Sequence, residues 1–193
     1  MQVYDIENIT LLNSEAEDLP FDDAYFDLIV SNNGINNVKE MEHVFQEISR
    51  TSTPGAQFVF TMNTAETMHQ FYDSFEAVLN ESGRPGEIDA MKQQIYSKRR
   101  PIEEIKDLVI NSEFTIEHIY YDDFVLSFVD SATMFRHPLI KYWFLDGWKN
   151  IIAQEFQDDV FSKIESRMDA RMNGNLHLSV PFVTFDCRRN DEN

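Results

Sequence analysis

One acidic stretch, Ser14-Glu-Ala-Glu-Asp-Leu-Pro-Phe-Asp-Asp-Ala-Tyr-Phe-Asp-Leu-Ile-Val-Ser31, holds residues whose types and spacing could do chemistry. It combines the end of a strand, an acidic loop, an apolar Leu19-Pro20-Phe21 segment and a second strand. In open α/β sheets, ligands bind outside the carboxyl ends of the strands. An acidic side chain there, beside a free backbone N–H, can accept from an exocyclic amine and donate to a ring nitrogen. The stretch is therefore a candidate site for the edge of an adenine ring.

Alternating strands and helices must position this loop. In amphipathic helices apolar residues recur at a period of 3.6, whereas buried strands appear as short, β-branched apolar runs. The first half of the chain shows both patterns. The strands expected there are Ile9–Asn13, Phe26–Val30 and Gln57–Thr61, with helices over residues 41–48 and 65–79. This alternation predicts an α/β fold with a parallel sheet.

The second half predicts an antiparallel addition at one edge of that sheet. After two shorter helices, the second opened by Pro101, the order is one long or two broken strands, helical pieces, a long helix and a closing strand. The expected bounds are Phe114–Val129, Ser131–Trp148, a helix to about Met172, and Leu176–Cys187.

Composition excludes several classes of function. With 16 basic and 34 acidic residues, the net charge of −18 disfavours nucleic acid and anionic membranes as partners. The one dense basic run, Lys98-Arg99-Arg100, precedes a proline and is predicted to be a solvated approach to a helix. A single cysteine, Cys187, and five scattered histidines predict neither a disulfide framework nor a metal site. No signal peptide and no long apolar run is found, so a cytoplasmic location is expected.

The acidic stretch resembles the corresponding region of class I S-adenosylmethionine-dependent methyltransferases, the type that includes quinone-biosynthesis and other small-molecule enzymes. The likeness continues through Glu47-Ile-Ser-Arg50 and Thr53-Pro-Gly-Ala56, which look like the turn before the fifth strand of that family. Together these blocks cover roughly residues 9–62. The resemblance implies a transferase with S-adenosylmethionine as cofactor and a small molecule as substrate.

The resemblance also implies residue roles. Glu15 matches the acidic residue that contacts the adenine amino group, and Ala16 the residue whose backbone N–H meets the ring. Ser31 and Asn32 match the end of the fourth strand, where the chain passes the methionine part and the transferred methyl. The alternatives are a solvated carboxylate for Glu15 and plain turn residues for Ser31 and Asn32.

The acceptor side is predicted from two regions. Asn36 and Asn37 fall where many relatives carry a histidine pair, so a histidine-based role is not expected there, and Asn36 is taken as a candidate substrate-binding residue. An aromatic segment before the last strand would roof the acceptor pocket or, alternatively, pack as a structural cap. Its candidate substrate-binding residues are Arg136, His137 and Trp143. Residues 131–174 are accordingly expected to form a helical cap within a single partial domain of residues 1–193. No catalytic base is named.

Nothing in the sequence matches the family's glycine-rich turn or its ribose-binding acid, and glycine totals only 6 residues, where about 7% is usual. With the family's strand order 3-2-1-4-5-7-6, the first two strands would be missing from an incomplete Rossmann-like sheet. The strand at Phe26–Val30 would then expose an unpaired edge, which favours a dimer or a second chain. The expected function is a truncated S-adenosylmethionine-dependent methyltransferase. The alternatives are a non-catalytic remnant that pairs with another chain, or one chain of a two-chain enzyme.

Overall fold

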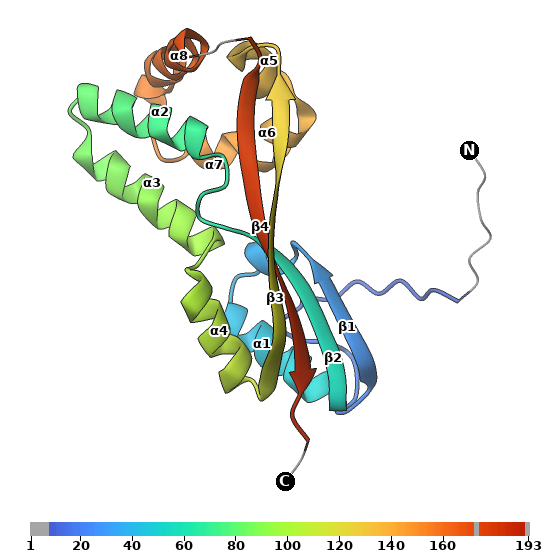
Figure 1. The fold of residues 1–193 in the computed structure, drawn as a ribbon. Helices are drawn as coiled ribbons and strands as arrows, with labels where there is room; N and C mark the ends of the chain where they lie inside the picture. The colour runs from blue at the N-terminus through green and yellow to red at the C-terminus, as the bar shows by residue number, and fades with distance from the viewer. Residues whose placement is uncertain (1–7, 172–173, 192–193) are drawn as a thin grey trace.

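Strands and helices alternate along the chain as expected. The computed structural model describes residues 8–171 and 174–191, and Figure 1 shows their arrangement. The strands are β1 (Phe26–Asn32), β2 (Ser52–Asn63), β3 (Phe114–Phe128) and β4 (Leu176–Arg189). The helices are α1 (Met41–Thr51), α2 (His69–Glu81), α3 (Pro85–Lys98), α4 (Ile102–Asn111), α5 (Ser131–Arg136), α6 (Pro138–Trp143), α7 (Leu145–Lys149) and α8 (Gln154–Ala170), with a 3-10 turn, η1 (Ile35–Asn37), after β1.

The four strands form one sheet in the order β1-β2-β4-β3. β1 and β2 are parallel, whereas β4 runs antiparallel to both β2 and β3. Strands joined by a helical crossover run parallel, and the antiparallel pair closes the far edge. This confirms the predicted α/β class and the antiparallel addition, and the order matches the last four strands, 4-5-7-6, of the Rossmann-like methyltransferase sheet.

The lower hydrophobic core lies between one face of the sheet and helices α1 and α4 (Figure 1). Alternate residues of β2 point into it, because side chains along a strand alternate between faces. Phe60 of β2 and Phe185 of β4 stack with ring centroids 4.8 Å apart, and both are fully buried. This core fixes the register of β2 against β4, and with it the carboxyl end of β2.

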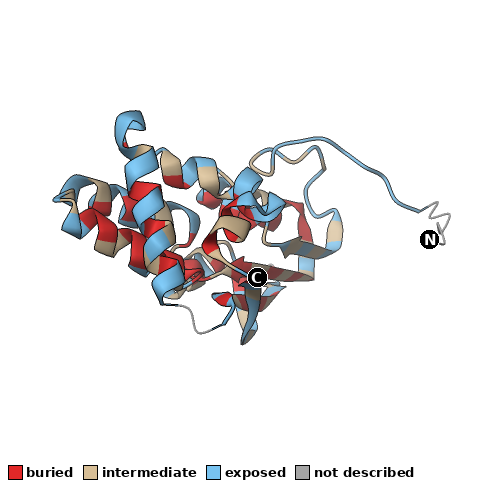
Figure 2. Cartoon of the chain, turned by 90° about the horizontal axis from the view of Figure 1, so that it is seen from above, coloured by how far each residue is buried: buried red, intermediate tan, exposed pale blue. Residues whose placement is uncertain are grey.

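The upper hydrophobic core is helical. Helices α2, α3 and α5–α8 enclose it together with the upper ends of β3 and β4, and Figure 2 shows its buried residues among these helices. Trp148 of α7 stacks on Phe71 of α2 at a centroid distance of 3.8 Å. The long β3–β4 ribbon runs through both cores and so joins the helical group to the sheet (Figure 1).

Two boundaries differ from the predictions. The helix expected from residue 65 begins at His69, because Thr64 N and Met68 N donate to carbonyls of Pro181 and Ser179 in β4 and hold this turn on the sheet. The strand predicted at Ile9–Asn13 is wrong. These residues are in no strand, and Leu11 is 91% exposed. No described strand lies beside them to pair with, and a β-branched run forms a strand only with a partner.

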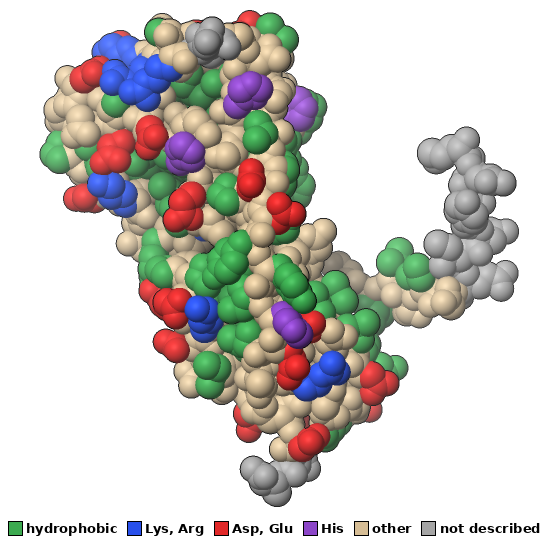
Figure 3. All heavy atoms as spheres, in the orientation of Figure 1, with side chains coloured by type: hydrophobic (Ala, Val, Ile, Leu, Met, Phe, Trp, Pro, Cys, Tyr) green, Lys and Arg blue, Asp and Glu red, His purple; other side chains and the backbone are tan. Residues whose placement is uncertain are grey.

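The lower part of the second face of the sheet carries no helix among the described residues. The register aligns Val30, Val59 and Asp186 across the strands on this face, opposite to the buried Phe58 and Phe60. Val30 and Leu28 are more than half exposed. Figure 3 shows hydrophobic side chains gathered over the middle of the molecule, where the strands run. By alternation along β4, Leu176 and Leu178 of the upper core lie on the same face as Asp186. The helical group thus covers the upper end of this face, and the part that carries Leu28 and Val30 stays open.

Candidate functional site

The acidic loop lies against the segment that follows β1. Glu17 Oε1 accepts hydrogen bonds from the backbone N–H groups of Lys39 (2.9 Å) and Glu40 (3.4 Å). These bonds, that of Lys39 above all, hold the pKa of the Glu17 carboxyl below its usual value. Because β1 ends at Asn32 and α1 begins at Met41, this contact sets the loop at the carboxyl end of the sheet.

Of the predicted adenine-binding pair, Glu15 is open to solvent and Ala16 is partly buried against the lower hydrophobic core. The Glu15 side chain is 74% exposed, and its one ion pair, to Lys39 at 3.7 Å, is itself exposed. Such a pair is weak. The backbone N–H of Ala16 donates to no residue in the described part of the chain. Both groups are therefore free to bind a ligand edge at this rim, as an adenine ring requires.

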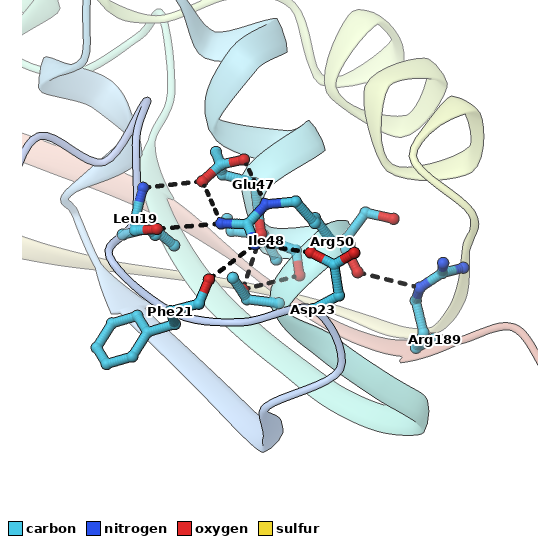
Figure 4. Close-up of polar contacts among 9 residues, drawn as sticks. Leu19, Phe21, Asp23, Glu47, Ile48, Arg50 and Arg189 are labelled. Atoms are coloured by element: carbon cyan, nitrogen blue, oxygen red, sulfur yellow. Dashed lines mark hydrogen bonds and ion pairs between the residues drawn. The ribbon is translucent and has the colours of Figure 1, made fainter.

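Arg50 of α1 clamps the acidic loop (Figure 4). Its guanidinium donates to the carbonyl oxygens of Phe21 (2.8 Å) and Leu19 (3.0 Å), to Asp23 Oδ1 (2.9 Å) and to both oxygens of Glu47. Glu47 Oε2 in turn accepts from the backbone N–H of Leu19 at 2.8 Å. The planar five-donor fork of arginine suits this set of contacts, and lysine does not.

The contact between Arg50 and Glu47 also shifts the pKa values of both side chains. The hydrogen bond from Arg50 is the main cause that holds the pKa of the Glu47 carboxyl below its usual value. The same bond raises the pKa of Arg50. Both groups therefore stay charged through the physiological range, and the loop stays attached to α1.

The turn after β1 is tightly built. Asn33 has a left-handed backbone with φ of 54°, and its N–H donates to Thr61 O of β2 at 3.1 Å. Asn32 Oδ1 accepts from Thr61 Oγ1 at 2.7 Å. A Cβ at Gly34 would lie 2.8 Å from Ser31 Oγ, so this position requires glycine unless the serine moves. Ser31 and Asn32, the predicted cofactor-binding residues, are thus the last two residues of β1, paired with β2 just before this turn.

A cavity of about 260 Å³ opens next to this turn, between the carboxyl ends of β1 and β2 and the helical group. Its lining comes from the turn after β1, the end of β2, helices α2 and α3, and helices α6 and α7. The lining residues are Asn33, Asn36, Asn37, Asn63, Tyr72, Gln94, Lys98, Arg99, Leu139, Trp143, Phe144, Gly147 and Trp148.

Three buried amide oxygens at the cavity lack a hydrogen-bond partner among the described residues. They are Asn33 Oδ1, Asn63 Oδ1 and Gln94 Oε1. A buried polar atom without a partner is costly, and in proteins such an atom usually meets a ligand or water. The three amides therefore leave acceptors at this cavity for water or for a ligand with polar groups, which makes it the candidate site.

Of the four predicted substrate-binding residues, two line the cavity. Trp143 lies on α6, and Asn36 is buried. The Asn36 amide donates to the carbonyl oxygens of Asn63 and Lys98 and accepts from the Asn63 N–H, so it joins the β1 turn to β2 and α3.

Arg136 and His137 are exposed and do not line this cavity. His137 Nδ1 accepts from the Leu139 N–H at 3.3 Å and so caps the start of α6.

The sequence did not single out the polar cavity residues Tyr72, Gln94, Asn63 and Arg99. Asn63 follows an expected strand, so the rule that ligands bind at carboxyl ends could have indicated it. Arg99 was predicted to be solvated, and this is wrong: it is 6% exposed. Its burial depends on Tyr72, which lies 27 residues away on another helix.

The described residues show neither a metal-binding cluster nor a helix suited to cross a membrane. They contain no group of three or more His, Cys, Asp or Glu side chains arranged to hold a metal ion. None of their helices combines the length and the apolar character that crossing a bilayer requires.

Comparison with known proteins confirms the resemblance of the first third of the chain. Residues 2–60 match the family described as a methyltransferase domain. The ubiquinone/menaquinone biosynthesis C-methyltransferase UbiE of Idiomarina loihiensis is 32% identical over 73 residues, which are 36% of this chain and 29% of that protein. The demethylmenaquinone methyltransferase of Bacillus cytotoxicus is 32% identical over 66 residues, which are 34% of this chain and 28% of that protein. The chain thus spans less than a third of the length of these curated relatives.

Solved structures share the fold over nearly the whole chain. The YcgJ protein of Bacillus subtilis matches with a TM-score of 0.54 at 14% identity, covering 96% of this chain and 73% of that protein. A Bacillus halodurans protein described as a methyltransferase matches with a TM-score of 0.52 at 12% identity, covering 94% and 78%. The fold is therefore the Rossmann-like α/β fold of these proteins.

Proposed function

We propose that this chain forms the acceptor-binding part and the adenine loop of an S-adenosylmethionine-dependent methyltransferase that acts on a small molecule. Its fold is that of class I methyltransferases, and its first third is similar to them in sequence. The observation that carries the proposal is the cavity at the carboxyl ends of β1 and β2, with its three unpartnered amide oxygens. It lies beside the turn that the methyltransferase resemblance assigns to the transferred methyl. Residues 131–174 act as the cap over it, within one domain.

The residues at the rim fit part of the cofactor. Glu15 is exposed, and the Ala16 N–H donates to no described residue. Ser31 and Asn32 do not line the cavity, but they end β1 directly before Asn33, which does. When bound, S-adenosylmethionine supplies a methyl group on an already activated sulfonium. The residues of this chain then have to hold the acceptor in line and keep water out, which is a proximity effect.

The aromatic cap serves the exclusion of water. Phe144 and Trp148 form a wall of the cavity with ring centroids 5.6 Å apart, and Trp148 is buried. Tyr72 accepts a hydrogen bond from Trp148 Nε1 at 2.9 Å, which fixes the indole against α2. This wall gives the acceptor a flat, dry surface to lie on.

The proposal includes additional strands beside β1. Among the described strands β1 pairs with β2 alone, and the sheet face with Leu28 and Val30 is uncovered. An unpaired edge next to an apolar face favours pairing with further strands. A longer form of the polypeptide or a second chain would supply them, together with the remaining cofactor contacts.

Calorimetric titration with S-adenosylmethionine tests the proposal. We expect this chain to bind the cofactor in the millimolar range, about −4 kcal/mol, because the adenine loop supplies only part of the contacts. Glu15→Ala should weaken binding about tenfold, the loss of one hydrogen bond to a charged group. Asp18→Ala, in the same loop and also exposed, is the matched control and should change nothing.

Equal affinity of Glu15→Ala and the unchanged chain would refute the adenine assignment. No binding by the chain, even when further strands complete its sheet, would favour the second candidate, a non-catalytic module. The specific observation behind that candidate is the same unpaired edge of β1.

A further inference from the structure

The cavity is basic, although the protein is strongly acidic. The chain has 34 acidic and 16 basic residues, yet the lining includes Lys98 and Arg99 and, among the described residues, no carboxylate. Arg99 is also the one charged side chain among the described buried residues. The cavity therefore presents positive charge within a negatively charged molecule.

Arg99 lacks the carboxylate that other arginines of the chain have. In the described part of the chain its guanidinium makes one hydrogen bond, from one terminal nitrogen to Tyr72 Oη at 3.5 Å. The arginines that do form ion pairs with carboxylates are Arg50, Arg84, Arg100, Arg167 and Arg189. A buried charge without a counter-ion is costly. Arg99 therefore has hydrogen-bond donors left for an anion, and the cavity is the way for one to reach them.

Tyr72 adds a second donor at the same place. Its hydroxyl oxygen accepts from Trp148 Nε1 and from Arg99, so its lone pairs are in use and its O–H proton remains to be donated. The ring of Tyr72 is buried, which fixes this hydroxyl. Guanidinium and phenol together offer several N–H and O–H donors to one anionic group.

The walls restrict the rest of the ligand. Trp143, Phe144 and Trp148 line the cavity, whose volume is about 260 Å³. Aromatic faces favour a flat, apolar body. One buried guanidinium matches a singly charged carboxylate, which it can bind through two parallel hydrogen bonds. A doubly charged phosphate would call for a second buried cation, and Lys98 is exposed.

We propose that Arg99 and the Tyr72 hydroxyl bind the carboxylate of a small, flat, largely apolar acid. The assignment of this acid as the methyl acceptor rests on the proposed function. Its binding is measurable without the cofactor, so the failure of one proposal is distinguishable from the failure of the other.

Tryptophan fluorescence reports on this cavity mainly through Trp148, which lines it and is 1% exposed, whereas the other tryptophan, Trp143, lines it but is 77% exposed. The probe is 4-methylbenzoate, a flat acid, and its uncharged control is the matching primary amide. We expect the acid to quench the fluorescence saturably and to bind at least about tenfold more tightly than the amide, as a buried charged pair predicts. Equal binding of acid and amide, or no saturable quenching by the acid, would overturn the proposal.

Arg99→Gln should remove the preference for the acid and leave amide binding unchanged. Arg100→Gln is the matched control, since the neighbouring Arg100 pairs with Glu42 at 2.6 Å outside the cavity lining. Without ligand, Arg99→Gln should melt at the same temperature or higher, because it removes a buried charge that has no counter-ion. A lower melting temperature would assign Arg99 to the support of Tyr72 and contradict the proposal.

The carboxylate of the methionine part of the cofactor is a second source of the same chemistry. Competition with L-methionine separates the two. Acid binding that is unchanged by L-methionine supports an acceptor site, whereas displacement that depends on Arg99 would overturn the acceptor assignment.

Discussion

At the scale of single residues, two arginines show how context decides the role of one side chain. Arg50 is satisfied by Glu47, Asp23 and the carbonyls of the acidic loop, and so it is structural. Arg99 donates one hydrogen bond to the Tyr72 hydroxyl and lines the cavity, and so its other donors are available to a ligand. The sequence shows both as basic residues at the end of a helix, and only the folded contacts separate them.

Arg50→Lys should loosen the acidic loop. Lysine keeps the charge but cannot donate to Leu19, Phe21, Asp23 and Glu47 at once. We expect hydrogen exchange at the Leu19 amide to become about tenfold faster, since local opening governs exchange in a loop. Arg167→Lys, which affects a single ion pair to Glu81, is the control and should leave Leu19 unchanged. Equal exchange rates at Leu19 in the Arg50 variant and the parent would contradict the clamp.

Cys187 gives a prediction about alkaline pH. Burial raises the pKa of its thiol from 9.0 to about 12, with a smaller contribution from Asp186. The folded state then holds the proton more tightly than the unfolded state. This stabilisation is fully present below pH 9 and is lost as the pH rises from 9 toward 12.

Urea denaturation at pH 7.5 and pH 10 measures this effect. The parent should lose more stability between the two values than Cys187→Ala, which has no thiol to ionise. The comparison uses the change with pH, because the alanine variant is expected to be less stable at both. Identical pH dependence in the two proteins would show that the thiol is not held in its protonated form.

At the scale of elements, periodicity predicted most of the helices and strands, because each of these buries its own apolar stripe. α1 is an example, with Met41, Val44, Phe45 and Ile48 all buried. The prediction of a strand at Ile9–Asn13 was wrong because an extended run forms a strand only beside a neighbouring strand. Local sequence does not show whether such a neighbour is present. The resemblance to methyltransferases placed the acidic loop and the β1 turn. It could not show that Asn63, at the end of β2, lines one cavity with Gln94 and Arg99, from α3 and its carboxyl end.

The β2–β4 core should tolerate truncation poorly. Phe60→Ala removes a fully buried ring that stacks on Phe185 and also contacts Phe45 and Phe58. We expect the free energy of unfolding to fall by about 3–5 kcal/mol, the usual cost of such a cavity. Val59→Ala, the adjacent residue on the open face, should cost clearly less. Similar losses in urea denaturation would mean that the two faces of β2 are equally covered.

The edge of β1 should govern association. Lysines on an edge strand oppose pairing with another strand. We therefore expect the chain to sediment as dimers or larger species, and Leu28→Lys with Val30→Lys to shift it toward monomer. A parent chain that sediments as a monomer at micromolar concentration would contradict this prediction.

At the scale of the whole molecule, the cavity exists because two hydrophobic cores meet along one β3–β4 ribbon. The lower core sets the carboxyl ends of β1 and β2, and the upper core sets α2, α3, α6 and α7 above them (Figure 1). The parallel α/β pattern predicted that ligands bind at this end of the sheet. The cap was predicted as a segment, but which of its aromatic residues face the cavity depends on packing between distant helices.

Nuclear magnetic resonance titration with S-adenosylhomocysteine tests the central claim most directly, because it reports weak binding residue by residue. We predict saturable shifts at the amides of Glu15, Ala16 and residues 31–33, with little change in α8. Shifts confined to other parts of the chain, or no shift at Ala16 at millimolar ligand, would contradict the assignment of the acidic loop and the β1 turn to the cofactor.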